Sequence, residues 1–328
     1  MKKPKIGIDL LGSDVCLESF LHSVTPILNK LSMNAEFIVF LKEEHRSLIP
    51  PLPFQPVFVS DIILMDDNPL HALRKKRNSS ISQGMRLLKE GQIDAFISSG
   101  NTGALVAAGK TMLKTIQGIQ RPALLTVIPA HGKQVAVLDV GANTTCKPSF
   151  LLQCAHMGIA YQKSRKISHP TVGLLNIGSE KMKGTPEHRQ AYQALQKLNL
   201  TTTSKVFLGN IEGREVFTGP VDVLVTDGFT GNVFLKTSEG MAALLLEELS
   251  QFLSQSENLK ALPFSFLQEW MKKLDYSEYP GAILCGVKGI VLKCHGSFHP
   301  KSLQPSILMA IELYEQKFLE AMASECNP

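Results

Sequence analysis

The chain has 328 residues, of which 44% are hydrophobic and 19% charged, and its formal net charge is +5 at pH 7. This is the composition of a soluble globular protein, and no stretch approaches the roughly 20 apolar residues of a membrane-spanning helix. The six cysteines are scattered without a CxxC pair, which excludes zinc-type spacing and argues against a disulfide framework.

The mild positive charge suits an anionic substrate, an acidic partner or an anionic membrane surface. One basic cluster, Arg74–Arg77, has no interleaved aromatic residues, so we expect no nucleic-acid partner. The basic start Met1–Lys5 precedes an apolar run that breaks at Asp9, which argues against a secretory leader. We therefore expect a cytoplasmic protein with reduced cysteines.

Apolar runs bounded by turn signals predict strands, and stretches with helical spacing predict helices. The predicted strands are Lys5–Leu11, Phe37–Leu41, Val57–Val59, Ile93–Ile97, Ala123–Ile128, Gln134–Val140, Thr171–Ile177, Lys205–Leu208, Val221–Val225 and Lys288–Lys293. The predicted helices are Leu17–Leu31, Asn78–Glu90, Ala104–Leu113, Pro148–Lys163, Glu187–Leu198, Asn232–Leu253 and Leu303–Ala323.

Strands alternate with helices, and most strands are nearly continuous apolar runs. This pattern predicts a three-layer α/β/α fold with a mostly parallel sheet covered on both faces. The two runs around His131-Gly132 predict a hairpin, and the apolar stripe of the last helix predicts core or subunit contact. Without an internal repeat or linker, residues 1–328 are expected to form one catalytic unit.

The turn Ser98–Ala104 follows a predicted buried strand and precedes a predicted helix. Its glycines permit close backbone approach, and its hydroxyls and amide could face an anion at a helix start. Asn101 and Thr102 could equally be ordinary helix caps. Similar turns recur after at least five other strands, and in a parallel sheet such ends line one edge, where ligands of α/β folds bind.

These turns supply amides, hydroxyls and backbone N–H groups, without a GxSxG elbow, an HExxH helix, a Walker A sequence or a GxGxxG fingerprint. They suit the binding of an oxyanion better than the supply of a protein nucleophile. The candidate phosphate- and substrate-binding residues are Gly12, Asp14, Ser99, Gly100, Asn101, Thr102, Gly103, Asp139, Gly141, Asn143, Asn176, Gly178, Asn210, Asp227 and Gly228.

Motifs in the same order along the chain resemble those of the bacterial phosphate acyltransferases. They are Ser98–Ala104, Leu138–Asn143, Gly173–Gly178, Lys183-Gly184, Gly209–Arg214, Asp227–Gly240, Asp275–Tyr279 and His295-Gly296-Ser297. The resemblance implies synthesis of acyl-phosphate from acyl-[acyl-carrier-protein] and inorganic phosphate, an early step of phospholipid biosynthesis. It also implies a homodimer that feeds a membrane glycerol-3-phosphate acyltransferase, and a Rossmann-like fold related to isocitrate and isopropylmalate dehydrogenases and to phosphotransacetylases.

In such a reaction phosphate is itself the nucleophile, so we expect placement and charge stabilisation, with neither cofactor nor metal. The expected catalytic residues are Lys183, to offset phosphate charge or polarise the thioester; Asn232, to donate to the oxyanion; and His295, to orient a group or protonate the thiolate. Each has a structural alternative, as a solvated lysine, a helix cap and a structural histidine respectively. Asp139 and Asp227 could hold their loops rather than react.

The stretch Leu259–Leu274 carries Phe264, Phe266 and Trp270 beside lysines, within a helical excursion expected over residues 241–280. An apolar face with flanking lysines fits peripheral contact with the inner face of the membrane, although packing on the core or a partner subunit is also open. Three other functions stay open as well: a short-chain acyl-CoA phosphotransacylase, a decarboxylating dehydrogenase and a non-catalytic membrane-associated scaffold.

Overall fold

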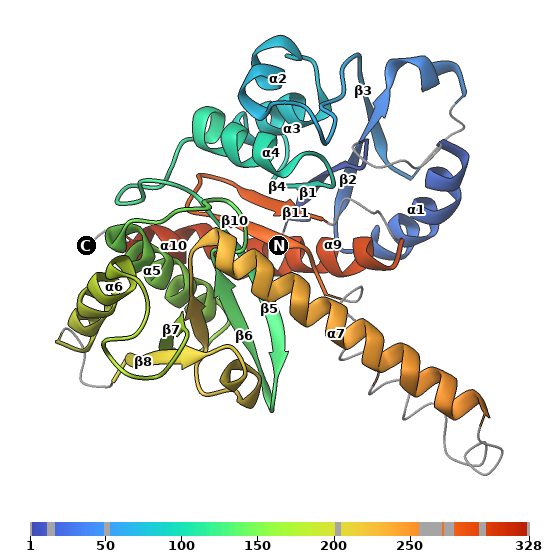
Figure 1. Ribbon diagram of the computed structural model, residues 1–328. Helices are drawn as coiled ribbons and strands as arrows, with labels where there is room; N and C mark the ends of the chain where they lie inside the picture. Colours follow the sequence, from blue (N-terminus) through green and yellow to red (C-terminus); the bar gives the residue numbers. More distant parts are fainter. Residues whose placement is uncertain are drawn as a thin grey trace.

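The computed structural model describes residues 2–11, 17–48, 53–200, 205–255, 271, 279–294 and 300–326 (Figure 1). One sheet holds all the strands of these residues, in the order β3-β2-β1-β4-β11-β10-β5-β6-β9-β7-β8. The strands are β1 Lys5–Asp9, β2 Glu36–Lys42, β3 Gln55–Val59, β4 Ala95–Ser98, β5 Ala123–Ala130, β6 Lys133–Leu138, β7 Val172–Asn176, β8 Phe207–Glu212, β9 Val223–Val225, β10 Ala282–Cys285 and β11 Ile290–Lys293.

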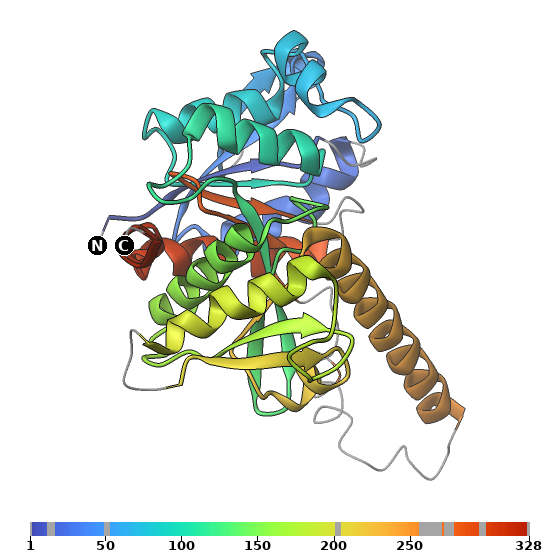
Figure 2. The same cartoon turned by 60° about the vertical axis from the view of Figure 1, so that its left-hand side comes forward.

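Helices cover both faces of the sheet, as the sequence predicts (Figures 1 and 2). They are α1 Leu17–Leu31, α2 Pro69–Lys75, α3 Ser80–Lys89, α4 Thr102–Ala108, α5 Pro148–Ser164, α6 Pro186–Gln196, α7 Gly228–Gln255, α9 Pro300–Glu315 and α10 Phe318–Cys326. Short turns of other helix types are Glu43–Leu48, Gly109–Leu113, Lys197–Leu200 and Glu215–Thr218.

Successive residues of a strand belong alternately to two separate apolar cores, one on each face of the sheet. Ile290 and Leu292 of β11 belong to the core under α1, α5, α6, α9 and α10, whereas Val291 belongs to the core under α2, α3 and α4. Successive strand side chains point to opposite faces, so a strand buried on both faces reads as a continuous apolar run. Both faces are therefore closed by helices, and the fold is a three-layer α/β/α arrangement with a mostly parallel sheet.

Two blocks of parallel strands run in opposite directions. The first contains β3, β2, β1, β4 and β11, and the second contains β6, β9, β7 and β8. Between them, β10 is antiparallel to β11 and to β5, and β5 is antiparallel to β6. The predicted hairpin at His131-Gly132 is thus confirmed, and it is the last of three reversals between the blocks.

The expectation that all strand tips share one edge is wrong, because these reversals point the two blocks at each other. The register nevertheless brings the tips together. Lys293, the last residue of β11, pairs with Ala282, and the next residue, Ile283, pairs with Leu125. Leu125 also pairs with Leu138, the last residue of β6. The carboxyl ends of the two blocks therefore meet near the middle of the sheet, from opposite sides.

The long helix α7 begins at this meeting point, and its distal half stands clear of the body in both views (Figures 1 and 2). Met241, Leu244, Leu245 and Phe252 lie on that half and are between 51% and 61% exposed. Within the described residues, no helix combines the length and apolar character needed to cross a bilayer.

Three further predictions differ from the structure. The last helix is broken, because Lys317 takes a left-handed φ of 53° that ends α9 and lets α10 pack on α5. Strand β8 continues through Asn210 to Glu212 instead of turning at Gly209, since the whole segment pairs with β7. The short elements α2 and β10 are absent from the sequence prediction. One prediction about the last helix is confirmed, because its apolar stripe belongs to the core.

Candidate functional site

A cavity of about 240 Å³ opens where the two strand blocks meet. Thr102 follows β4, and Lys293 and Cys294 end β11, so the first block supplies one side. Val140 follows β6 and Asn232 lies in the first turns of α7, so the second block supplies the other. Thr126, Lys236 and Glu239 add polar side chains to the lining, and Met65, Leu124 and Leu235 are among the apolar ones. The cavity therefore joins a few polar groups to an apolar wall, as small-molecule sites do.

The loop after β6 is held by one buried carboxylate. Asp139 Oδ1 accepts hydrogen bonds from the backbone N–H groups of Leu124 (3.0 Å), Gly141 (3.1 Å) and Ala142 (2.9 Å). Its Oδ2 accepts from the backbone N–H of Asn143 at 2.8 Å and from the Asn143 side chain at 2.9 Å. Burial raises the pKa of Asp139, and these donors act against that shift. In this structure Asp139 and Asn143 shape the loop.

The start of α7 packs directly on that loop. Asp227 caps the helix by accepting from the backbone N–H groups of Phe229 and Thr230 at 3.0 and 2.9 Å. Gly231 is required by close approach, since a Cβ there would lie 2.0 Å from the Asp139 carbonyl oxygen. Asn232 Nδ2 donates to the Val140 carbonyl at 3.1 Å, which fixes the amide at the cavity wall.

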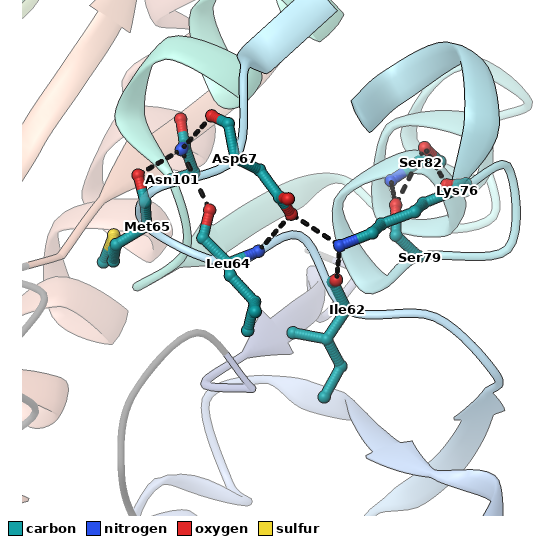
Figure 3. A network of polar contacts seen from close by, with 8 residues as sticks. All are labelled: Ile62, Leu64, Met65, Asp67, Lys76, Ser79, Ser82 and Asn101. Atoms are coloured by element: carbon teal, nitrogen blue, oxygen red, sulfur yellow. Dashed lines mark hydrogen bonds and ion pairs between the residues drawn. The ribbon is translucent and has the colours of Figure 1, made fainter. Parts of the chain in front are cut away.

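The polar groups of the turn after β4 are largely engaged in hydrogen bonds, and Figure 3 shows those of the Asn101 side chain to the loop of Leu64 and Met65. Asn101 caps α4 through Oδ1, and its Nδ2 donates to the carbonyls of Leu64 at 3.0 Å and Met65 at 2.8 Å. Gly100 donates its N–H to Ser98 Oγ at 3.1 Å. Asn101 thereby fixes the loop that brings Met65 to the cavity, and of this turn Thr102 is the residue that lines it.

A buried polar cluster under the cavity contains a residue that the sequence prediction missed. Lys293 is only 9% exposed, and its ammonium donates to the carbonyls of Ser99 at 3.2 Å and of Cys294. Beside it, Asp9 is fully buried and accepts from Ser98 Oγ at 2.8 Å. Burial raises the pKa of Asp9 and lowers that of Lys293 to about 8. A charged residue closing an otherwise apolar strand was the available signal.

Lys183 lies outside the cavity, in a loop near the ends of β7 and β8. Asn176 Nδ2 donates to the Lys183 carbonyl at 3.2 Å, and Asn210 Nδ2 donates to the Glu180 carbonyl at 2.8 Å, so two amides hold the loop that contains Gly178. The Lys183 ammonium lies 3.8 Å from a Glu180 carboxylate oxygen, and its side chain is 48% exposed. Neither Lys183 nor these amides line the cavity described above.

Of the predicted site residues, Thr102 and Asn232 line the cavity, and the Asp139 and Asp227 loops support it. Gly228 packs closely on the Asn143 backbone, since a Cβ there would lie 2.5 Å from the Asn143 carbonyl oxygen. Ser99 lies beside Lys293, with its hydroxyl buried and unpartnered. The predicted residues Gly12, Asp14, His295, Phe264, Phe266 and Trp270 lie outside the described residues.

No cysteine thiolate is available in this loop region. Cys146 follows the Asn143 loop, and its Sγ lies 3.6 Å from the Asn143 carbonyl. Burial raises the pKa of Cys146 to about 12, so it stays a thiol at neutral pH.

Comparison with known proteins shows the family of the chain. A family model described as "Fatty acid synthesis protein" matches residues 4–321. A phosphate acyltransferase of Chlamydia caviae is 40% identical over 331 residues, which cover 98% of this chain and 99% of the relative. A phosphate acyltransferase of Thermotoga maritima is 39% identical and covers 93% of this chain and 92% of its own.

Solved structures share the fold at much lower identity. A phosphotransacetylase from Streptococcus pyogenes has a TM-score of 0.63 at 14% identity and covers 95% of this chain and 94% of its own. A branched-chain phosphotransacylase from Enterococcus faecalis has a TM-score of 0.60 at 16% identity, with coverage of 95% and 99%. At these identities the likeness concerns the fold alone.

The hydrogen bonds of Asp139 predict that its replacement by the isosteric asparagine destabilises the protein. Asp139→Asn replaces one acceptor oxygen by a donor that faces backbone N–H groups, so we expect the free energy of unfolding to fall by about 1–3 kcal/mol. Urea denaturation measures this. Asp66→Asn, at an exposed carboxylate, is the control and should leave stability unchanged. Equal stabilities of the two variants would contradict the role of Asp139 as the anchor of the loop.

Proposed function

Given that the chain belongs to the phosphate acyltransferase family and is an enzyme of acyl transfer, we propose that it makes long-chain acyl-phosphate from acyl-[acyl-carrier-protein] and inorganic phosphate. The product would enter phospholipid synthesis. The observation that carries the proposal is the cavity between the strand blocks, where an amide and lysines meet an apolar wall. The near-complete match to phosphate acyltransferases supports acyl transfer to phosphate as the reaction, and we propose the cavity as its place.

The proposed reaction needs no covalent enzyme intermediate. A phosphate oxygen attacks the thioester carbonyl carbon, a C–O bond forms, the C–S bond breaks, and the leaving thiolate takes up a proton. The enzyme places the two substrates and stabilises the negative charge that develops on the carbonyl oxygen. The raised pKa of Cys146 agrees with this route, because the nearby thiol is not ionised.

Asn232 is our candidate for the oxyanion donor. One N–H of its amide is engaged with the Val140 carbonyl, and an amide NH₂ group has a second donor. The bond to Val140 fixes the direction of the amide before substrate binds, which is the condition for effective charge stabilisation. For Lys183, on the loop at the ends of β7 and β8, we keep the other predicted role, polarisation of the thioester carbonyl, because this residue does not line the cavity where phosphate would bind. His295 is proposed to orient a group or to protonate the thiolate.

The long acyl chain requires more room than the cavity provides. A volume of about 240 Å³ lies below the usual range of roughly 300–1,000 Å³ for ligand pockets, and suits the reacting groups alone. The net charge of +5 favours an acidic donor such as a carrier protein. A short-chain acyl-CoA donor is the alternative that the small volume itself favours.

We further propose that the protein is a cytoplasmic homodimer, peripherally bound to the membrane next to a glycerol-3-phosphate acyltransferase. The exposed apolar side chains on the distal half of α7 are the proposed contact between the two subunits, since large apolar patches mark interaction sites. The stretch with Phe264, Phe266 and Trp270 follows α7 in the chain and is the proposed membrane contact.

The substrate proposal is tested by thiol release from long-chain acyl-[acyl-carrier-protein], with and without inorganic phosphate. We expect release only when phosphate is present, and slower release from short-chain acyl-CoA, because the carrier protein adds binding energy. Phosphate-dependent release from acyl-CoA alone would instead favour the short-chain alternative. Lipid or partner binding without any release would favour a scaffold.

The assigned catalytic residues predict lower turnover in single variants. Asn232→Ala removes a fixed donor, so we expect kcat to fall about 10²–10³-fold. Lys183→Ala should also lower kcat sharply, whereas Lys197→Ala, at an exposed lysine after α6, should not. Circular dichroism checks folding. Near-wild-type turnover of both active-site variants would remove the assignment.

The two proposed contacts predict separate losses. A Phe264→Glu, Trp270→Glu variant should no longer float with anionic liposomes yet should keep its oligomeric state. A Leu244→Glu, Phe252→Glu variant places charges on the apolar face of α7, and we expect sedimentation to show monomers. Unchanged flotation of the first variant, or an intact dimer of the second, would contradict the corresponding contact.

A further inference from the structure

We propose that Lys293 is the cation that binds inorganic phosphate in the cavity between the two strand blocks. This inference rests on the proposed function, because it takes the cavity as the place of reaction. The sequence prediction assigned phosphate charge to Lys183, which lies on a different loop and is half exposed. Lys293 instead lines the cavity and is almost completely buried.

Among the described residues, hydrogen bonds occupy two of the three donors of the Lys293 ammonium. An ammonium group has three N–H donors. Two are engaged with the carbonyls of Ser99 and Cys294, at the ends of β4 and β11. The Lys293 backbone packs closely on Gly281, since a Cβ on Gly281 would lie 2.0 Å from the Lys293 carbonyl oxygen. The ammonium is therefore held in place by the chain itself, at the wall of the cavity.

Among the described residues, Lys293 has no paired carboxylate. Within the part of the chain that the structure describes, no carboxylate lies within ion-pair distance of its ammonium. Asp9, on β1, acts on it through the electrostatic field and is engaged with Ser98. On α7, Lys236 is already paired with Glu239 at 2.7 Å. A buried ammonium without a paired anion is costly, and a bound phosphate would supply that anion.

Phosphate binding should therefore depend on pH through this residue. Burial lowers the pKa of Lys293 to about 8, so the free enzyme loses the positive charge as pH rises through that value. A phosphate dianion favours the charged form, so binding above about pH 8 must take up a proton. By linkage, the affinity for phosphate falls by up to roughly tenfold per pH unit above that point. The neighbouring Cys294 thiol has a pKa raised by burial and forms a hydrogen bond with Ser306.

Calorimetry of the wild-type protein with inorganic phosphate tests the inference without a substitution. Titrations above about pH 8, in two buffers of different ionisation enthalpy, report the protons taken up per phosphate bound. We expect uptake that approaches one proton per phosphate well above pH 8 and that declines as the pH falls through this value, because Lys293 is then increasingly charged before phosphate binds. Binding without proton uptake above about pH 8, or no detectable binding of phosphate, would overturn the proposal.

Variants assign the proton to this side chain. Lys293→Met removes the charge at similar length, and we expect the Kd of phosphate to rise about tenfold or more. Lys293→Arg keeps a charge that does not titrate, so its phosphate affinity should no longer fall above about pH 8. Lys288→Met, at the exposed start of the same segment, is the matched control and should bind phosphate as the wild type does. Unchanged affinity of a folded Lys293→Met variant would overturn the assignment.

These readouts separate the two proposals. If the wild-type enzyme releases no thiol from acyl-[acyl-carrier-protein] in the presence of phosphate, the proposed donor is refuted. Proton-linked binding of phosphate would still support Lys293 in that case. Conversely, active wild-type enzyme whose phosphate affinity does not change with pH would keep the function and exclude Lys293 as the phosphate-binding cation.

Discussion

The change of strand direction across β10 and β5 is the constraint on which the rest of the structure depends. Because β10 and β5 are antiparallel to each other and to their outer neighbours, the two parallel blocks point their carboxyl ends at one another. The pairing of Leu125 with both Ile283 and Leu138 sets how far the blocks overlap. A shift of this register would move Lys293 away from Val140 and Asn232, and the cavity would lose one of its two walls.

Most of the polar side chains at the strand ends stabilise loops. Asp139 binds four backbone N–H groups and one side chain, Asn101 binds the loop of Leu64 and Met65, and Asn210 binds the Glu180 carbonyl. Such satisfied groups make the loops rigid, since an unpaired buried polar atom is costly. Rigid loops in turn hold the Asn232 amide and the Lys293 ammonium in fixed directions, which is what charge stabilisation requires.

The sequence alone was sufficient for the layered fold, because strands buried on both faces and helices with apolar stripes have distinct patterns. The hairpin at His131-Gly132 was visible too. The opposition of the two blocks was not, because it depends on β10, a strand of four residues that pairs with β11 and with β5, which is far away in the sequence. Lys317 ended the last helix through its backbone conformation, for which an ordinary lysine gives no signal.

Part of the predicted set of site residues coincides with the cavity. Asn232 and Thr102 line the cavity, and the motifs around them identified the correct family. Lys293 was missed because a lysine at the end of an apolar strand resembles a strand terminator. Only the folded structure shows that it is buried, with no carboxylate of the described residues paired to it. The most direct measurement is a crystal structure of the enzyme with inorganic phosphate. The account predicts phosphate between the two blocks, about 2.7–3.2 Å from Lys293 Nζ and beside Asn232. Phosphate bound instead on the loop of Lys183, with this cavity unoccupied, would contradict it.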